Sequence, residues 1–92
     1  MAFDTKCQIF TQAEIASLRI GGAILRDCLQ HVATLVRPGV TTLELDLVAE
    51  ECIRSRGGRP AFKGYFGFTG TLCTSVNEDV VHGIPRSEKI LK

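Results

Sequence analysis

The first half of this chain is divided by a repeated pattern that marks the start of a helix. Residues 11–14 (TQAE) and residues 41–44 (TTLE) each place a threonine three positions before a glutamate. In such a capping box the threonine side chain accepts from a backbone N–H of the first turn, and the glutamate reaches back to the threonine N–H. The pattern therefore predicts two helices, one beginning after each threonine.

The spacing of apolar residues predicts how far each helix runs. Steps of three and four after Thr11 describe one face of a helix of about 25 residues, ended by the Arg-Pro-Gly of residues 37–39. The second helix continues from Thr41 and ends at the glycine pair of residues 57–58. A glycine pair at residues 21–22 lies inside the first helix and indicates close packing against another element, or a ligand contact. The predicted stripe of the first helix is Ile15, Leu18, Gly22, Leu25, Leu29, Val32 and Val36.

The character of the sequence changes after residue 58. Residues 59–70 (RPAFKGYFGFTG) hold four aromatic residues and three glycines, which predicts a structured loop rather than a helix or strand. Residues 71–77 alternate apolar and polar side chains as a half-buried strand does, residues 77–79 supply a turn, and residues 80–82 return as a short strand. The predicted fold class is α+β, with two N-terminal helices, an aromatic and glycine-rich loop, and an antiparallel β-hairpin.

Size and charge exclude several classes of function. Ninety-two residues make one small domain, and a net charge of +1 gives no basic field for nucleic acid. No apolar run approaches the ~20 residues that span a bilayer, and the first residues lack a basic stretch followed by an apolar one. We therefore expect a cytoplasmic protein with no nucleic-acid or membrane partner.

The four cysteines, Cys7, Cys28, Cys52 and Cys73, include no Cys-x-x-Cys pair. Their spacing is unlike that of a zinc site. In a cytoplasmic protein we expect reduced thiols, buried as small apolar residues.

Two features could carry chemistry. His82 stands at the end of a β-type run beside Gly83, so it could act as general acid, general base or metal ligand, with Gly83 leaving room for a substrate backbone. The alternative is a strand-end histidine bonded to a carbonyl. The aromatic residues of the loop either form core or line an apolar pocket for one unbranched side chain; they are Phe62, Tyr65, Phe66 and Phe68.

The carboxylates do not suggest a metal centre. A two-metal hydrolase needs several converging carboxylates and usually a histidine, and no such set can be assembled from this chain. Glu78 and Asp79 lie in the predicted turn. The others are interpreted as charges on helix surfaces or in caps, namely Asp4, Glu14, Asp27, Glu44, Asp46, Glu50 and Glu51.

Three blocks together resemble a type I methionine aminopeptidase: residues 57–68 (GGRPAFKGYFGF), residues 72–78 (LCTSVNE) and residues 80–85 (VVHGIP). The resemblance extends over essentially the whole chain and includes residues 37–46 (RPGVTTLELD). It implies removal of the initiator methionine from new proteins whose second residue is small. It also implies the α/β pita-bread fold, in which two similar halves surround a dinuclear metal site.

The resemblance also assigns roles by position. His82 matches a histidine that is not a metal ligand but contacts the scissile amide and helps to protonate the departing amine. Asn77 and the backbone of Asp79 match a monovalent-cation site. The positions that match the pocket for the methionine side chain, where an apolar wall suits a thioether, are Phe62, Tyr65, Phe68 and Cys73.

Small departures from the family pattern are Thr69, where proline is common, and Phe62, a variable pocket position. The large departure is length, because the five metal ligands of the family lie beyond the equivalent of Lys92. Residues 1–92 are thus expected to be the N-terminal portion of the catalytic domain, without the metal-binding remainder and inactive alone.

The full-length enzyme is expected to hold two divalent metal ions (Co, Mn, Fe or Zn), none of them bound by this segment. Its expected partners are nascent polypeptide N-termini, at the ribosome. The alternative is a non-catalytic truncated module that keeps the pocket and binds peptide N-termini or a partner protein.

Overall fold

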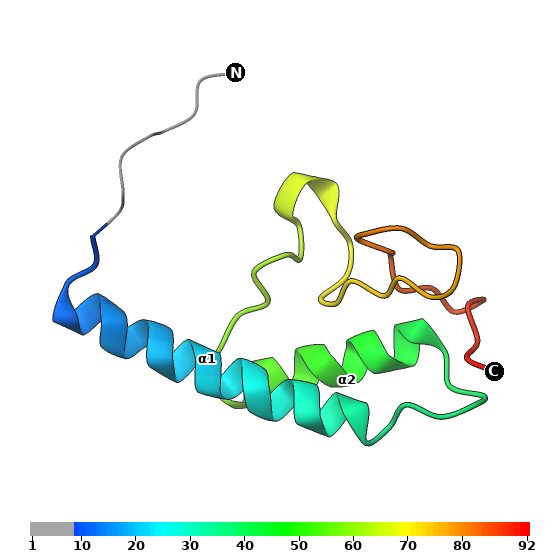
Figure 1. Cartoon of the computed structure of the whole chain (residues 1–92), viewed down its shortest axis with the longest axis horizontal. Helices are drawn as coiled ribbons and strands as arrows, with labels where there is room; N and C mark the ends of the chain where they lie inside the picture. The colour runs from blue at the N-terminus through cyan, green and yellow to red at the C-terminus, as the bar shows by residue number, and fades with distance from the viewer. Residues whose placement is uncertain (1–8) are drawn as a thin grey trace.

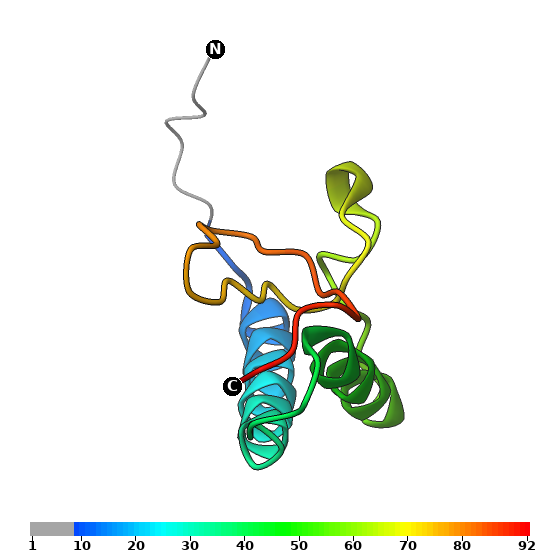
Figure 2. The ribbon, with the colours of Figure 1, turned by 90° about the vertical axis from the view of Figure 1, so that its right-hand side faces the viewer.

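Two helices lying side by side form the base of the molecule (Figure 1). This computed structural model describes residues 9–92, except for the side chain of Phe66. Helix α1 comprises Gln12–Ala33, helix α2 comprises Thr42–Ser55, and a short 3₁₀ helix, η1, comprises Tyr65–Gly67. The rest of the chain after α2 runs back over the helices as loops, which Figure 2 shows from the end of the molecule. Within residues 9–92 no helix is both long and apolar enough to cross a membrane.

Both predicted capping boxes are confirmed. Glu14 N–H donates to Thr11 Oγ1 over 3.1 Å, and Thr11 N–H donates to Glu14 Oε1 over 2.8 Å. The same pair of bonds joins Thr41 and Glu44, over 3.1 Å and 3.2 Å. Each box satisfies N–H groups that have no partner within a helix, so these residues begin the helices.

Helix α1 ends three residues earlier than the sequence pattern predicts. Beyond Ala33 the chain continues with bonds between residues three apart, from Leu35 N–H to Val32 O and from Val36 N–H to Ala33 O. Such bonds tighten the last turn and satisfy helix-end carbonyls. The Thr34 hydroxyl adds a bond to His31 O, 2.6 Å long. The turn therefore closes before Pro38 could end the helix by itself.

The core lies between the C-terminal half of α1 and the N-terminal half of α2. Cys28 and Val32 of α1 are buried, as are Leu45 and Ala49 of α2. Partly buried residues complete this core, among them Leu72 and Leu91 of the loops above it. The core is small, as expected for a chain of this length.

The predicted apolar stripe of α1 is not the face that packs on α2. Val32 belongs to the core, but Leu18, Leu25, Leu29 and Val36 are each at least half exposed in the structure. Among residues 9–92 nothing lies within 4 Å of a Cβ built on either glycine of residues 21–22, so this part of the chain does not show the close packing expected there. The cause is geometric, because α2 lies against the neighbouring stripe that carries Cys28.

The end of the chain pairs with the connection between the two helices. Thr41 and Ile90 form an antiparallel bridge, and Leu91 N–H donates to Val40 O over 2.8 Å. Thr42 N–H donates to Lys89 O over 3.0 Å. These bonds bring the last residues back to the start of α2.

The β-hairpin predicted over residues 71–82 is not shown, because residues 9–92 contain no strand. The chain does double back, and Thr74 N–H donates to Gly83 O over 2.8 Å, but regular pairing does not develop. Val81 and His82 have φ of 23° and 60°, which takes the returning arm out of the extended conformation. A two-stranded hairpin alone is marginal in water, and Val80 of this arm is 81% exposed.

Cys28, Cys52 and Cys73 are free thiols. Cys28 alone among these three is buried as predicted, since Cys52 is half-buried and Cys73 is exposed. Cys7 and Asp4 lie outside the described residues.

Candidate functional site: an apolar pocket with a histidine and a cysteine at its edge

A buried carboxylate on α2 holds the segment that leads into the site. Asp46 is 3% exposed, and its Oδ1 accepts from Thr71 N–H over 2.6 Å and from Leu72 N–H over 2.7 Å. Its interpretation as a helix-surface charge is therefore wrong. The signal was present in the sequence, because residue 46 follows Leu45 and precedes Ala49 by three, and both belong to the buried face of α2.

The loop approaches α2 closely at both of its ends. A Cβ built on Gly70 would lie 2.8 Å from Pro85 Cδ and 3.2 Å from Asp46 Oδ1, so only glycine fits there without a shift. At the other end the Thr42 hydroxyl accepts from Arg86 N–H over 2.9 Å and donates to Arg86 O over 3.1 Å. Helix α2 is thus the platform on which residues 70–86 are fixed.

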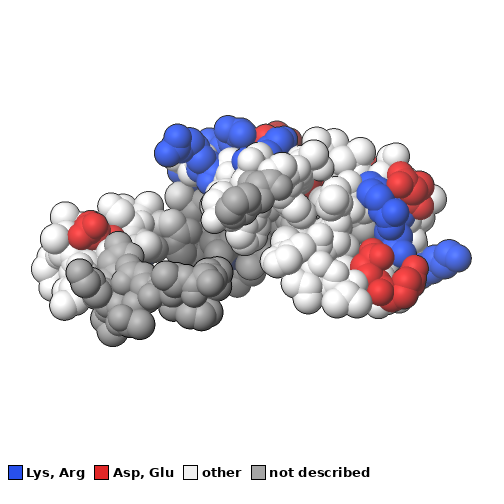
Figure 3. Space-filling view, turned by 90° about the horizontal axis from the view of Figure 1, so that it is seen from above, with Lys and Arg blue, Asp and Glu red and all other residues white. Residues whose placement is uncertain are grey.

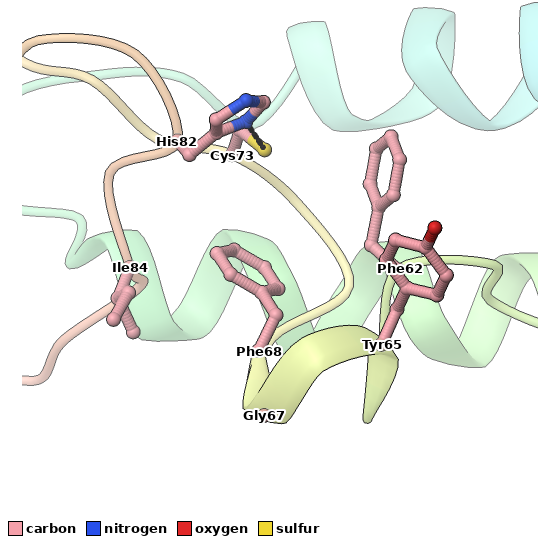
Figure 4. Close-up of a pocket in the computed structure, with 7 residues that line it drawn as sticks. All are labelled: Phe62, Tyr65, Gly67, Phe68, Cys73, His82 and Ile84. Atoms are coloured by element: carbon pink, nitrogen blue, oxygen red, sulfur yellow. Dashed lines mark hydrogen bonds between the residues drawn. The ribbon is translucent and has the colours of Figure 1, made fainter. Parts of the chain in front are cut away.

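An apolar pocket of about 410 Å³ opens among these loops (Figure 4). Pockets of roughly 300–1,000 Å³ with mostly apolar walls and a few polar groups are typical of small-ligand sites. The structure brings together five residues singled out from the sequence and adds two that were not. The lining residues are Phe62, Tyr65, Gly67, Phe68, Cys73, His82 and Ile84.

The aromatic wall is set by glycines in the left-handed region. Gly64, with φ of 83°, turns the chain into η1, and Gly67, with φ of 77°, turns it out again. Phe62 and Tyr65 stand on one side of the pocket and Phe68 between them and Ile84, as Figure 4 shows. Ile84 was missed, although an apolar residue between Gly83 and Pro85 was the available signal.

The polar edge of the pocket is a histidine–cysteine contact. Cys73 Sγ lies 3.3 Å from His82 Nδ1, within hydrogen-bond distance for sulfur. His82 adopts a φ of 60°, unusual for a residue other than glycine and a frequent feature of functional sites. Gly83 keeps this geometry, because a Cβ there would run into the backbone of Thr74 and lie 2.7 Å from its carbonyl carbon.

Asn77 and Asp79 lie at the turn and do not line the aromatic pocket. Asn77 has a φ of 55°, and Asp79 N–H donates to Val76 O over 3.0 Å. The Asp79 carboxylate is 3.9 Å from both Arg86 Nη2 and Lys89 Nζ. Their part in a monovalent-cation site stays a prediction.

Acidic and basic side chains lie next to one another around this turn (Figure 3). Lys89 Nζ is 3.1 Å from Glu78 Oε1. A hydrogen bond from its own backbone N–H and then the bond from Lys89 lower the pKa of Glu78. The turn therefore carries balanced charge rather than a field of one sign.

A dinuclear metal centre does not fit the residues at hand. Within residues 9–92 no group of three or more histidine, cysteine, aspartate or glutamate side chains is placed to hold a metal ion.

Comparison with known proteins defines the class. A family profile described as metallopeptidase family M24 matches residues 16–92. The chain therefore belongs to this family of metallopeptidases, whose enzymes act with bound metal ions.

Within that class the chain is similar to methionine aminopeptidases. It is 43% identical over 86 residues to that of Borreliella burgdorferi, covering 94% of this chain and 34% of the relative. It is 44% identical over 82 residues to methionine aminopeptidase 1 of Bacillus subtilis, covering 89% of this chain and 33% of the relative. The chain thus spans about a third of the length of these relatives.

Solved structures agree on the fold. The crystal structure of methionine aminopeptidase from Rickettsia prowazekii superposes with a TM-score of 0.86 at 35% identity, over 92% of this chain and 34% of that one. The enzyme from Thermotoga maritima gives 0.88 at 36% identity, with the same coverage. The described residues therefore adopt part of the pita-bread fold of these enzymes.

Proposed function

We propose that the protein containing this chain removes N-terminal methionine from polypeptides whose second residue is small. The observation that carries the proposal is the apolar pocket with His82 at its edge. The similarity to methionine aminopeptidases supports it. The residues to which the resemblance assigns contact with the substrate all line this pocket.

In this proposal the pocket receives the methionine side chain. Its aromatic rings, Phe62, Tyr65 and Phe68, offer polarisable apolar surface to the thioether, and sulfur–aromatic contacts are favourable. A charged side chain would lose hydration there, and no carboxylate among residues 9–92 lines the pocket to form an ion pair with a cation. The pocket therefore selects an apolar, unbranched side chain.

In this proposal His82 contacts the scissile amide of the substrate. When the Cys73 thiol donates to Nδ1, the neutral imidazole carries its own proton on Nε2. That nitrogen is then free to donate a hydrogen bond to the amide. Once the ring has taken up a second proton, the imidazolium can pass the Nε2 proton to the departing amine and return to the neutral form. Cys73 holds the ring in this tautomer, so it is a positioning residue as well as a pocket wall.

The remaining parts of the reaction lie with the whole protein. Two divalent metal ions, of Co, Mn, Fe or Zn, would supply an activated water when bound, as metal ions do in hydrolases. New polypeptide chains at the ribosome would be the substrates, in the cytoplasm. We propose that Asn77 and the backbone of Asp79 bind a monovalent cation there. Residues 1–92 alone would then be inactive.

The test measures methionine release from Met-Ala-Ser by the metal-loaded, full-length protein. Lys-Ala-Ser should be cleaved at least about 100-fold more slowly, because the pocket cannot pair its charge. His82→Ala should lower kcat by roughly 10²–10⁴, the usual contribution of a general acid. The matched control is His31→Ala, since His31 is the other histidine of the chain and lies exposed on α1.

Equal effects of the two histidine substitutions would refute the role of His82. Equal cleavage of the lysine and methionine peptides would refute the role of the pocket. Tight binding of Met-Ala-Ser without any release, in protein shown to carry metal, would instead support the non-catalytic binding module.

A further inference from the structure

Two cysteines that the proposed reaction does not use face each other across the helix pair. Cys28 of α1 and Cys52 of α2 place their Sγ atoms 2.6 Å apart, although 24 positions separate them in sequence. A disulfide requires about 2.05 Å. The two unbonded sulfurs are in direct contact, between helices that already pack together (Figures 1 and 2).

The two thiols differ in access to solvent. Cys28 is 3% exposed and belongs to the interface between the helices. Cys52 is half-buried and lines a groove of about 480 Å³ that Cys28 does not line. A small oxidant in the groove can therefore reach Cys52 first.

The acidity of the buried Cys28 thiol also bears on its role. Burial, followed by the hydrogen bond with Cys52, raises the pKa of the Cys28 thiol to about 11. Cys28 is thus held as a thiol near neutral pH and does not react readily with an oxidant. The raised pKa slows the second step of an oxidation as well, but there the Cys28 sulfur is already in contact with its partner, the sulfur of Cys52.

We propose that Cys28 and Cys52 form a reversible dithiol–disulfide pair that responds to hydroperoxides. The Cys52 thiolate attacks the outer oxygen of the hydroperoxide, the O–O bond breaks, and Cys52 becomes a sulfenic acid while the peroxide leaves as water or an alcohol. The Cys28 sulfur then attacks the Cys52 sulfur, the S–O bond breaks, and water leaves with the Cys28 proton. Both electrons go to the hydroperoxide, and a thiol reductant reverses the change.

The cross-link would act on the platform of the site. Helix α2 carries Asp46, which holds the backbone leading to Cys73. The Asp27–Arg56 ion pair, 2.9 Å long, already ties the two helices together beside these cysteines. A covalent bond there fixes α2 against α1, and disulfides in cytoplasmic proteins are mostly of this switching kind.

The test uses the protein at its full natural length, treated with hydrogen peroxide and then digested without reduction. Trypsin does not cut between Arg37 and Pro38, so residues 27–54 leave as one peptide that contains both cysteines. Cys73 leaves separately within residues 64–86. We expect the 27–54 peptide to lose two hydrogen atoms, and its fragments to stay linked after cleavage at Glu44. We also expect Tm without reductant to exceed Tm with reductant by at least about 5 °C.

Variants assign the order of the two steps. Cys28→Ala should accumulate a Cys52 sulfenic acid that dimedone traps, and Cys52→Ala should leave Cys28 as a free thiol. Cys73→Ala is the matched control and should form the cross-link at the same rate. Should Cys28→Ala not fold, mapping of the unsubstituted protein decides by itself. A 27–54 peptide with two free thiols, one with a sulfinic acid, or a Cys52–Cys73 link would overturn the proposal.

Discussion

Replacing Asp46 by alanine should loosen the whole pocket loop from α2. The carboxylate is buried and accepts two short N–H bonds, from Thr71 and Leu72. Hydrogen bonds to a charged group contribute about 1.5–3 kcal/mol each, and the substitution leaves both buried N–H groups without that acceptor. The two losses are not fully additive, so we expect Asp46→Ala to lower the free energy of unfolding by about 3–5 kcal/mol.

The substitution Asp46→Asn distinguishes the contribution of the negative charge from that of the acceptor oxygen. The amide keeps an oxygen that can accept at the same place, but it lacks the charge that strengthens both bonds. We expect this variant to lose about 1–2 kcal/mol, clearly less than alanine.

Urea unfolding of the full-length protein measures both changes, with Asp27→Ala as the control. Asp27 has a third of its side chain exposed and pairs with Arg56 and Arg26 at the surface, where such pairs contribute less than about 1 kcal/mol. The reasoning fails if Asp46→Ala costs no more than the control. It also fails if Asp46→Asn is as damaging as Asp46→Ala, because the bonds would then not depend on the acceptor oxygen.

Two further changes test other contacts. Gly83→Ala places a Cβ against the Thr74 backbone, so it should lower the free energy of unfolding by about 1–3 kcal/mol. We also expect kcat/KM to fall, because His82 is displaced. Unchanged stability and activity would contradict the close approach of Gly83 to Thr74. The hydrogen bond from Lys63, and then that from Arg54, lowers the pKa of Glu50. The ion pair therefore stabilises the fold at pH values above the ordinary pKa of 4.5, and this stabilisation is lost as the pH falls through the lowered pKa. Lys63→Met should therefore cost less than about 1 kcal/mol near neutral pH and nothing in strong acid, and a penalty that does not shrink on acidification would refute this.

Local signals in the sequence were sufficient to predict where both helices begin. A capping box contains its own partner three residues away, so Thr11 and Thr41 could be identified without knowledge of the rest of the fold. The buried stripe of α1 could not be identified in this way, because several stripes of that helix are apolar and the position of α2 decides which of them is covered. The end of α1 was also misplaced, since a tightened final turn competes with the breaking effect of Pro38.

The hairpin shows a different limit. Alternation of apolar and polar residues predicts a strand only when something covers one face, and a two-stranded ribbon has little stability alone. Residues 71–82 keep the reversal of direction but not the regular pairing. The pocket depends on the reversal, because it brings Cys73 and His82 together, and not on the strands.

Asp46 shows why the residues of the pocket could be predicted from the sequence more readily than the contacts that hold the pocket loop on α2. Its place on the buried face of α2 was visible in the spacing, and a buried carboxylate requires donors. Those donors are backbone N–H groups 25 and 26 residues away, which carry no side-chain signature. Any residue type at positions 71 and 72 except proline could supply them. The pocket residues, by contrast, have distinctive side chains in a recognisable order. The pocket residues are therefore held in place by backbone N–H groups, which cannot be recognised from the sequence. Only the fold shows that α2 fixes the loop that carries His82.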